Sequence, residues 1–334
     1  MTTFFLYAMT SILAFSCGKH DTGPPDSNPT VNLRPLFLAD PTILYDQGIY
    51  YLYGTDDINA NRGFTVYTST DLKTWKGPAG VSGGYALKKG DAYGNSGFWA
   101  PQVFKYNDVF YMAYVADQHI AIATSDSPLG PFVQQAKTPV TAPVNIIDPY
   151  IFIDDDGKKY LYYVRLDKGN RIFAARLNGA LTDIMPGTSV SCINAVDQPQ
   201  AWENTSGASW TVTEGPTVLK HQGYYYLFYS ANDFRNIDYA VGYAVSKNPM
   251  GPWKKYSGNP ILSRTLVGQN GPGHGDFVKD GREKYYYVFH THHSSNQVSP
   301  RKTALIQGNF IAGGDGGADK MFFDKQHFFY LMAN

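Results

Sequence analysis

A pattern of alternating apolar and polar residues, interrupted by aromatic runs, recurs along the whole chain. In VTEGPTVLKHQGYYYLFYS, residues 212–230, a β-rich run (Pro216–Leu219) is followed by a short turn (Lys220–Gly223) and an aromatic run (Tyr224–Tyr229). Two such runs on either side of a turn predict a β-hairpin. No segment of ordinary helix length shows a convincing apolar periodicity of 3.6 residues. The pattern therefore predicts an all-β protein.

The same hairpin unit occurs four more times. The further copies begin at residues 40, 99, 148 and 274 and read DPTILYDQGIYYLYG, WAPQVFKYNDVFYMAYV, DPYIFIDDDGKKYLYYV and HGDFVKDGREKYYYVF. Repeated small antiparallel sheets form a propeller, in which the innermost strands line a central channel. The sequence therefore predicts a five-bladed β-propeller.

The five units can be aligned on a proline near their start. The aligned residues are Pro41, Pro101, Pro149 and Pro216, with Asp276 in the fifth place. Corresponding positions of the innermost strands converge near the axis of a propeller. We therefore expect three carboxylates, a histidine and a tryptophan to lie together, although they are far apart in sequence. These residues are Asp40, Trp99, Asp148, Glu214 and His274.

Three carboxylates at the starts of inner strands are costly to bury unless they are used or paired. One explanation is a polar channel filled with water. The catalytic explanation is a glycosidase, which needs one carboxylic acid to protonate the leaving oxygen and a carboxylate that acts on the other side of the sugar. A third carboxylate can keep the pKa of the acid high, because like charges disfavour ionisation.

Together these motifs strongly resemble glycoside hydrolase family 43. They are LADPTILYDQGIYYLYG, WAP, IIDPYIFIDDDG, TEGPTVLKHQGYYYLFYS and GPGHGDF, and the resemblance covers about residues 34–310. It implies a five-bladed propeller and hydrolysis with inversion. Carried over by position, it implies that Asp40 is the general base, Glu214 the general acid, and Asp148 the residue that modulates the pKa of the acid and orients it.

The resemblance also implies a class of substrate. Known members are mostly α-L-arabinofuranosidases, β-xylosidases, arabinanases and some galactosidases. We expect a hydrolase of plant cell-wall hemicellulose or pectin side chains, with exo-acting α-L-arabinofuranosidase or β-xylosidase activity preferred. Two long insertions, Lys76–Phe98 and Ser191–Val212, precede inner strands and are expected to shape a pocket on one face.

Three residues are candidates for binding. His274 matches a family histidine near the axis that in some members helps to hold calcium, largely through water; the alternative is a hydrogen-bonded histidine without metal. Arg301 matches a family arginine that faces the sugar, with a surface salt bridge as its alternative. Trp99 either stacks on the sugar or forms a wall of the pocket. No cofactor is expected to be required, and calcium is the one candidate ion.

Two other clusters are interpreted as structural. His290, His292 and His293 resemble a zinc cluster, but residues at one strand end point to alternating faces and cannot all share one ion. The run Asp154–Gly157 lacks the glutamate with which a calcium loop ends, so a hairpin turn is expected there.

Composition narrows the class of partner. The 334 residues carry a formal net charge of zero, and aromatic residues, including 26 Tyr, make up 15% of the chain. Neutral charge without a basic patch argues against nucleic acid. Aromatic rings suit the apolar faces of sugars. We expect an oligosaccharide or polysaccharide substrate and a monomer.

The N-terminal segment has the pattern of an export signal. Residues Phe4–Phe15 are apolar and too few to span a bilayer, and Ser16-Cys17-Gly18 resembles the cleavage site of a bacterial lipoprotein. No Lys or Arg precedes the apolar run. We expect a signal peptide over residues 1–17, a flexible tether over 18–32 and the catalytic propeller over 33–334. The expected location is the periplasm or, through a lipid on Cys17, the outer membrane.

Two other activities are compatible with the same propeller. A retaining enzyme of the invertase type would use Asp40 as nucleophile, with carboxyl groups about 5–5.5 Å apart rather than about 6.5–9.5 Å. A non-catalytic sugar-binding propeller would be favoured if one of the carboxylates were missing, and all three are present.

Overall fold

The computed structural model describes Met1, residues 32–313 and residues 317–334. Apart from Met1 and residue 32, the expected signal peptide and the expected tether lie outside the described residues. Residues Leu33–Asn334 form one compact unit. Within the described part of the chain, no helix is both long enough and apolar enough to cross a membrane.

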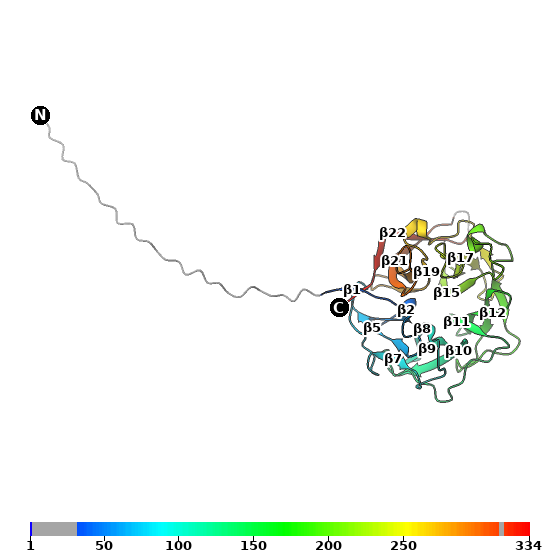
Figure 1. Ribbon diagram of the computed structural model, residues 1–334. Helices are drawn as coiled ribbons and strands as arrows, with labels where there is room; N and C mark the ends of the chain where they lie inside the picture. The colour runs from blue at the N-terminus through cyan, green and yellow to red at the C-terminus, as the bar shows by residue number, and fades with distance from the viewer. Residues whose placement is uncertain (2–31, 314–316) are drawn as a thin grey trace. The chain divides into compact units, whose positions relative to one another are not determined.

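Five antiparallel sheets surround a common axis in this unit, which is therefore a five-bladed β-propeller (Figure 1). The strands of each blade are given from the axis outward. Blades 1 and 2 have three strands each: β2 (Ala39–Asp46), β3 (Ile49–Thr55) and β5 (Tyr67–Ser69) in blade 1, and β8 (Trp99–Tyr106), β9 (Val109–Ala116) and β10 (His119–Ser125) in blade 2. Blades 3, 4 and 5 have four strands each: β11 (Ile146–Ile153), β12 (Lys159–Leu166), β13 (Asn170–Arg176) and β14 (Val190–Ile193) in blade 3; β15 (Thr213–His221), β16 (Tyr224–Ala231), β17 (Ala240–Ser246) and β18 (Lys254–Lys255) in blade 4; and β19 (Gly273–Lys279), β20 (Tyr285–Thr291), β21 (Lys302–Ile311) and β22 (Lys320–Tyr330) in blade 5.

The hairpin expected from the sequence is present in blade 4. Strands β15 and β16 pair antiparallel, with Thr217 opposite Phe228 and His221 opposite Tyr224. Positive φ angles at Gln222 (46°) and Gly223 (72°) form the tight turn between them. Alternate residues face the two neighbouring blades, so both faces of the sheet are apolar. The hairpin of the fifth repeat unit, β19 and β20, is extended outward by two further strands, β21 and β22.

The two ends of the propeller meet at blade 1. Strand β23 (Met332–Ala333) pairs antiparallel with β1 (Arg34–Pro35) and parallel with β6 (Thr74–Trp75). This small sheet joins the beginning and the end of the compact unit. It therefore closes the ring of blades by backbone hydrogen bonds.

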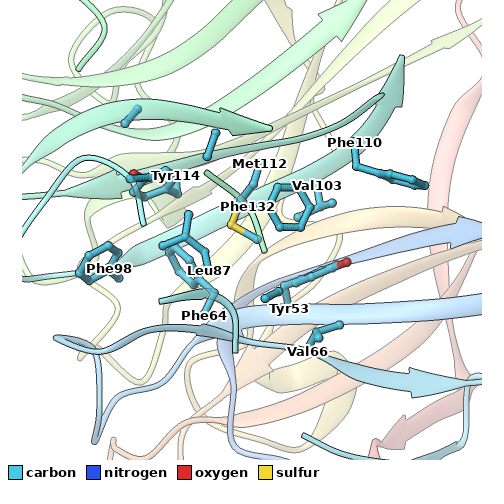
Figure 2. Packing of buried hydrophobic residues seen from close by; sticks show 14 of the residues in the cluster. Tyr53, Phe64, Val66, Leu87, Phe98, Val103, Phe110, Met112, Tyr114 and Phe132 are labelled. Atoms are coloured by element: carbon cyan, nitrogen blue, oxygen red, sulfur yellow. The ribbon is translucent and has the colours of Figure 1, made fainter. Parts of the chain in front are cut away.

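Apolar cores lie between neighbouring blades. Figure 2 shows the core between blades 1 and 2, where Tyr53 and Phe64 pack near Met112, Tyr114 and Phe132. Phe132 follows a glycine-proline turn and is fully buried, so this aromatic serves the packing between blades. Burying one such side chain stabilises the fold by about 1.5–3 kcal/mol.

The two insertions are built differently. Residues 76–98 include β7 (Tyr85–Lys88), which pairs with β4 (Gly63–Thr65), so this segment is partly a sheet. Residues 191–212 include the short helix η1 (Ala201–Asn204). The other helix of the described chain is α1 (Arg264–Val267).

Lys255 of β18 holds the second insertion in place. Its ammonium lies 2.7 Å from Glu203 of η1 and also donates to the carbonyls of Asn194, Asp197 and Gln198.

Candidate active site

Each innermost strand begins with a β-bulge. The antiparallel register shifts there in all five blades. One residue at each shift has a positive φ, which costs a non-glycine residue on the order of 1–3 kcal/mol and is typical of functional sites. The five residues, with their φ angles, are Asp40 (47°), Ala100 (45°), Asp148 (52°), Gly215 (59°) and His274 (44°).

This equivalence corrects the alignment of the fifth unit by one residue. The sequence predicted that Gly275 corresponds to Asp40 and Asp148, and that Asp276 corresponds to the prolines. In the structure His274 has the positive φ, and Gly275 stands where the other units have proline. The fifth unit has no proline to mark its register, and the bulge is one residue earlier than assumed. His274 therefore shares a ring position with the two aspartates.

Asp40 is held as an anion. Its carboxylate accepts hydrogen bonds from Thr55 Oγ1 (2.8 Å) and Arg301 Nη1 (2.9 Å), and Nδ1 of His274 lies 3.4 Å from Oδ1. The backbone N–H of Asp40 donates to Nδ1 of His290. Burial opposes ionisation, but Arg301 and the two imidazoles hold the pKa of Asp40 well below its ordinary value.

Arg301 lies in the wall of the site and bridges two aspartates. Its Nη2 donates to Oδ1 of Asp57 at 2.8 Å, its backbone N–H donates to Oδ2 of the same residue, and its Nη1 donates to Asp40. The guanidinium carbon lies 4.6 Å from the ring centroid of Phe234. Only 6% of Arg301 is exposed, so it is not a surface salt bridge.

Glu214 is a buried carboxyl with two donors. Tyr239 Oη donates to Oε1 and Asn170 Nδ2 donates to Oε2, each at 2.9 Å. These donors favour the anion, but burial outweighs them and, with the charges of Asp40 and Asp233, raises the pKa of Glu214 to about 7. The group can therefore hold a proton near neutral pH and release it, as a general acid must.

Asp148 is less well solvated by the protein than Glu214. Its Oδ2 accepts a hydrogen bond from the backbone N–H of Gly215 at 3.2 Å. Burial first, and then the charges of Glu214 and Asp40, raise the pKa of Asp148 well above its ordinary value. The carboxyl groups of Asp148 and Glu214 therefore disfavour each other's ionisation. The modulating role expected for Asp148 remains a proposal.

His274 lies at the axis but does not complete a metal shell. Burial lowers the pKa of His274, and its Nδ1 faces Asp40. Calcium binds six to eight oxygen ligands. Among the described residues there is no group of three or more His, Cys, Asp or Glu side chains placed to hold a metal ion. These side chains alone do not fit a calcium site, so an ion would need water for most of its ligands.

The carboxylates open into one cavity of about 360 Å³. Trp99, which is 37% exposed, lies in the wall of this cavity. The cavity thus brings together every residue that the sequence proposed for the site. Its walls are formed by Asp40, Thr55, Asp57, Ala60, Trp99, Ile147, Asp148, Asn170, Val212, Glu214, Asp233, Phe234, His274 and Arg301.

The three histidines near residue 290 face different partners. His290 is fully buried beside Asp40, while His292 Nε2 faces the carbonyl of Phe234 and His293 Nδ1 faces that of Pro300. Asp154–Gly157 forms the turn between β11 and β12, with Gly157 at a φ of 77°.

Sequence reasoning missed several residues of the site. Asp57 and Asn170 carry no motif, and Tyr239 is one of 26 tyrosines. His290 was considered only as part of a metal cluster. Asn170 begins β13, the third strand of blade 3, and only the fold brings it beside the inner strand of blade 4 that carries Glu214. The arrangement as a whole can donate a proton from one side of a bound sugar and accept one from water on the other.

Comparisons with known proteins agree with this geometry. A sequence model of glycosyl hydrolases family 43 matches residues 27–314. A solved endo-1,4-beta-xylanase from Bacteroides thetaiotaomicron is 39% identical, with a TM-score of 0.81 over 91% of this chain and 100% of that one. An endo-arabinase from the same organism is 26% identical, with a TM-score of 0.67 over 84% and 96%. The beta-D-galactofuranosidase xynD of Aspergillus niger is 24% identical over 87% of this chain and 81% of its own length.

Proposed function

Because the chain belongs to glycosyl hydrolases family 43 and is a glycoside hydrolase, we propose that it cleaves plant cell-wall glycans with inversion at the anomeric carbon. The observation that carries the assignment of acid and base is the opposite pKa shift of two carboxyl groups in one cavity, while inversion is proposed from the membership of the family. Asp40 is held ionised, whereas the pKa of Glu214 is raised to about 7. Environments that move two such pKa values apart identify the base and the acid.

In this mechanism Glu214 transfers its proton to the glycosidic oxygen as the bond from that oxygen to the anomeric carbon breaks. Asp40 accepts a proton from the water that attacks the opposite face of the same carbon. Arg301 and Thr55 hold the carboxylate of Asp40 in place. Asp148 and His274 line the same cavity as the acid and the base.

We further propose an exo-acting α-L-arabinofuranosidase or β-xylosidase. A cavity of about 360 Å³ is near the lower end of ligand sites, which span about 300–1,000 Å³. Such a volume suits a terminal sugar better than a long chain. The names of the relatives refer to xylan, arabinan and a galactofuranoside, so membership of the family leaves the sugar open.

An endo-acting hydrolase of xylan or arabinan is the second candidate. A neighbouring hollow shares Ala60 and Trp99 with the catalytic cavity. A further hollow shares Asn61 with that one and is lined by Arg62 and Lys88 among others. Consecutive hollows of this kind would suit an extended glycan that continues past Trp99.

Three assays test these proposals. Aryl α-L-arabinofuranoside and aryl β-xyloside identify the sugar, and the absence of hydrolysis of both, and of plant oligosaccharides, would refute catalysis. Proton NMR of the first product shows its anomeric configuration, and retention would favour the invertase-type mechanism. Digestion of labelled oligosaccharides of increasing length distinguishes release of terminal sugars from internal cleavage.

For location we propose export and attachment by a lipid on Cys17. The support is the apolar run Phe4–Phe15 followed by Ser16-Cys17-Gly18. Cys17→Ala is expected to move the protein from the membrane fraction to the soluble one. If the variant fractionates like the wild type, lipid attachment is excluded while export is not.

A further inference from the structure

Asn170 binds the segment that carries the general acid through all four of its hydrogen-bonding groups. Its backbone N–H donates to the carbonyl of Thr211 (2.9 Å), and its own carbonyl accepts from Thr213 Oγ1 (3.0 Å). Its side-chain Nδ2 donates to Glu214, and its Oδ1 accepts from Trp210 Nε1, each at 2.9 Å. One residue thus fixes the run that leads into β15.

The glycine before Asn170 permits this close approach. Gly169 has a φ of 124°, and a Cβ built there would lie 2.8 Å from the carbonyl oxygen of Thr211. Any larger residue at this position would therefore push β13 away from the segment that carries Glu214. The contact between the start of β13 and the segment before β15 therefore depends on the backbone of both.

The indole of Trp210 determines which way the Asn170 amide faces. An indole N–H can only donate, so the amide atom next to it must be the oxygen. The amide nitrogen then faces Glu214 and stabilises its anion. If the amide turned over, its oxygen would face Glu214 and favour the protonated form instead. The orientation of one amide is therefore coupled to the ring of Trp210.

Trp210 is also exposed, and its position relative to Glu214 indicates which part of a substrate would cover it. Half of the residue is accessible to solvent, although its N–H is hydrogen-bonded. Glu214 must contact the glycosidic oxygen, so the leaving group lies on the side of the cavity where Glu214 stands. Trp210 is bonded to the residue that bonds Glu214, and it is therefore on that side. An exposed indole there offers an apolar face to a sugar ring.

We propose that Trp210 binds the leaving-group sugar and, by holding the amide of Asn170, positions Glu214 for proton transfer. The inference rests on the proposed glycosidase function and assigns Trp210 as a specificity residue and Asn170 as a positioning residue. A sugar on the indole limits movement of Trp210 and so keeps the amide nitrogen on Glu214. Binding of the leaving-group sugar therefore stabilises the hydrogen bond that positions Glu214 for proton transfer.

Other groups also act on Glu214 and would be unchanged by substitutions of Trp210 or Asn170. The titratable and charged residues around it are Asp40 of β2, Asp148 of β11, Asp233 and Arg235 after β16, and Tyr239 before β17. The hydrogen bond of the indole goes to Asn170, so substituting Trp210 changes the Asn170 amide first.

The experiment compares Trp210→Phe, Trp210→Ala and Asn170→Ala on an oligosaccharide and on a glycosyl fluoride. The fluoride has no sugar on the leaving side and needs little protonation. A hydrogen bond to a charged group is worth about as much free energy as one pKa unit. We therefore expect the basic limb of kcat/KM on the oligosaccharide to move up by about one pH unit in Asn170→Ala, and in the same direction in Trp210→Phe.

Trp210→Ala should in addition raise KM for the oligosaccharide about three- to tenfold, the effect of losing one aromatic contact. Its loss of activity on the fluoride should be smaller than its loss on the oligosaccharide. Trp202→Phe is the control, because this indole lies in the same insertion and donates to Gln200 instead. An unmoved basic limb in Trp210→Phe, or an unchanged KM in Trp210→Ala, overturns the proposal. Wild-type protein that hydrolyses neither substrate would instead refute the glycosidase function.

Discussion

Arg301 binds Asp40 through Nη1 at 2.9 Å and at the same time binds Asp57 through Nη2 at 2.8 Å. The proposed base is therefore linked, through one cation, to a second carboxylate that stands outside the ring of inner-strand bulges. Asp57 sets the position of the guanidinium, and the guanidinium sets the charge state of Asp40.

Replacing Arg301 should change the pH dependence of activity at its acidic limb. In the wild type the pKa of Asp40 is well below its ordinary value, so the base is ionised down to low pH. Arg301→Met removes the attached cation and lets burial dominate, which raises this pKa. Activity should then be lost at a higher pH as the solution is acidified. The measurement is kcat/KM from about pH 3 to 9, which spans the ordinary carboxyl range.

Arg301→Lys is the matched control for that variant. It keeps a positive charge but loses the fork that binds both aspartates. Its acidic limb should remain closer to that of the wild type, while kcat falls. An acidic limb that is unmoved in Arg301→Met would show that Arg301 does not set the pKa of Asp40.

Removal of the acid and removal of the base should differ in their dependence on the leaving group. Glu214→Ala should lose about 10²–10⁴-fold on natural glycosides, the usual contribution of general acid catalysis. It should lose much less on activated aryl glycosides, whose leaving groups need little protonation. Asp40→Ala should be nearly inactive on both, because no water is activated.

The comparison of kcat/KM on the two substrates tests this assignment. If Glu214→Ala is equally impaired on both and Asp40→Ala recovers with the better leaving group, the two roles are reversed.

Asp148→Asn should lower kcat and move the basic limb to lower pH. Burial and the charge of Glu214 raise the pKa of Asp148, and the repulsion between the two carboxyl groups acts on both of them. A neutral amide removes this repulsion from Glu214, whose pKa then depends on burial, Asp40 and Asp233. An unmoved basic limb of kcat/KM would show that Asp148 does not modulate the pKa of Glu214.

Lys255→Met should destabilise the protein strongly. The side chains of Lys255 and Glu203 are 7% and 1% exposed and lie 2.7 Å apart. Breaking a buried ion pair leaves the partner uncompensated and costs about 3–5 kcal/mol. The adjacent Lys254→Met is the control, since the side chain of Lys254 is exposed. Equal denaturation midpoints for the two variants would show that the buried pair adds nothing.

Removal of calcium should leave the propeller folded. Each pair of neighbouring blades buries its own apolar core, and the described side chains do not form a calcium shell. The melting temperature in a chelator should therefore equal that in added calcium. A lower value in the chelator would assign a structural ion to the axis near His274.

The site residues that could be predicted from the sequence are those that stand at equivalent positions of the repeated units. Asp40, Asp148 and Glu214 stand at fixed places before a proline, and the convergence of inner strands brought them together. His274 was displaced by one position because its unit lacks that proline. Asp57 and Asn170 could not be found, since they enter the site from the ends of outer strands and loops. Repeat symmetry determines the inner strands and leaves those connections unspecified.

Strand β23 lies between β1 and β6, so blade 1 obtains part of its outer layer from Met332 and Ala333. They lie at the opposite end of the compact unit from β2, which carries Asp40. The ring around Asp40 therefore closes only when the two ends of this unit pair. Contacts between residues so far apart in sequence are slow to form. Assembly of the candidate site is thus tied to the slowest contacts of folding.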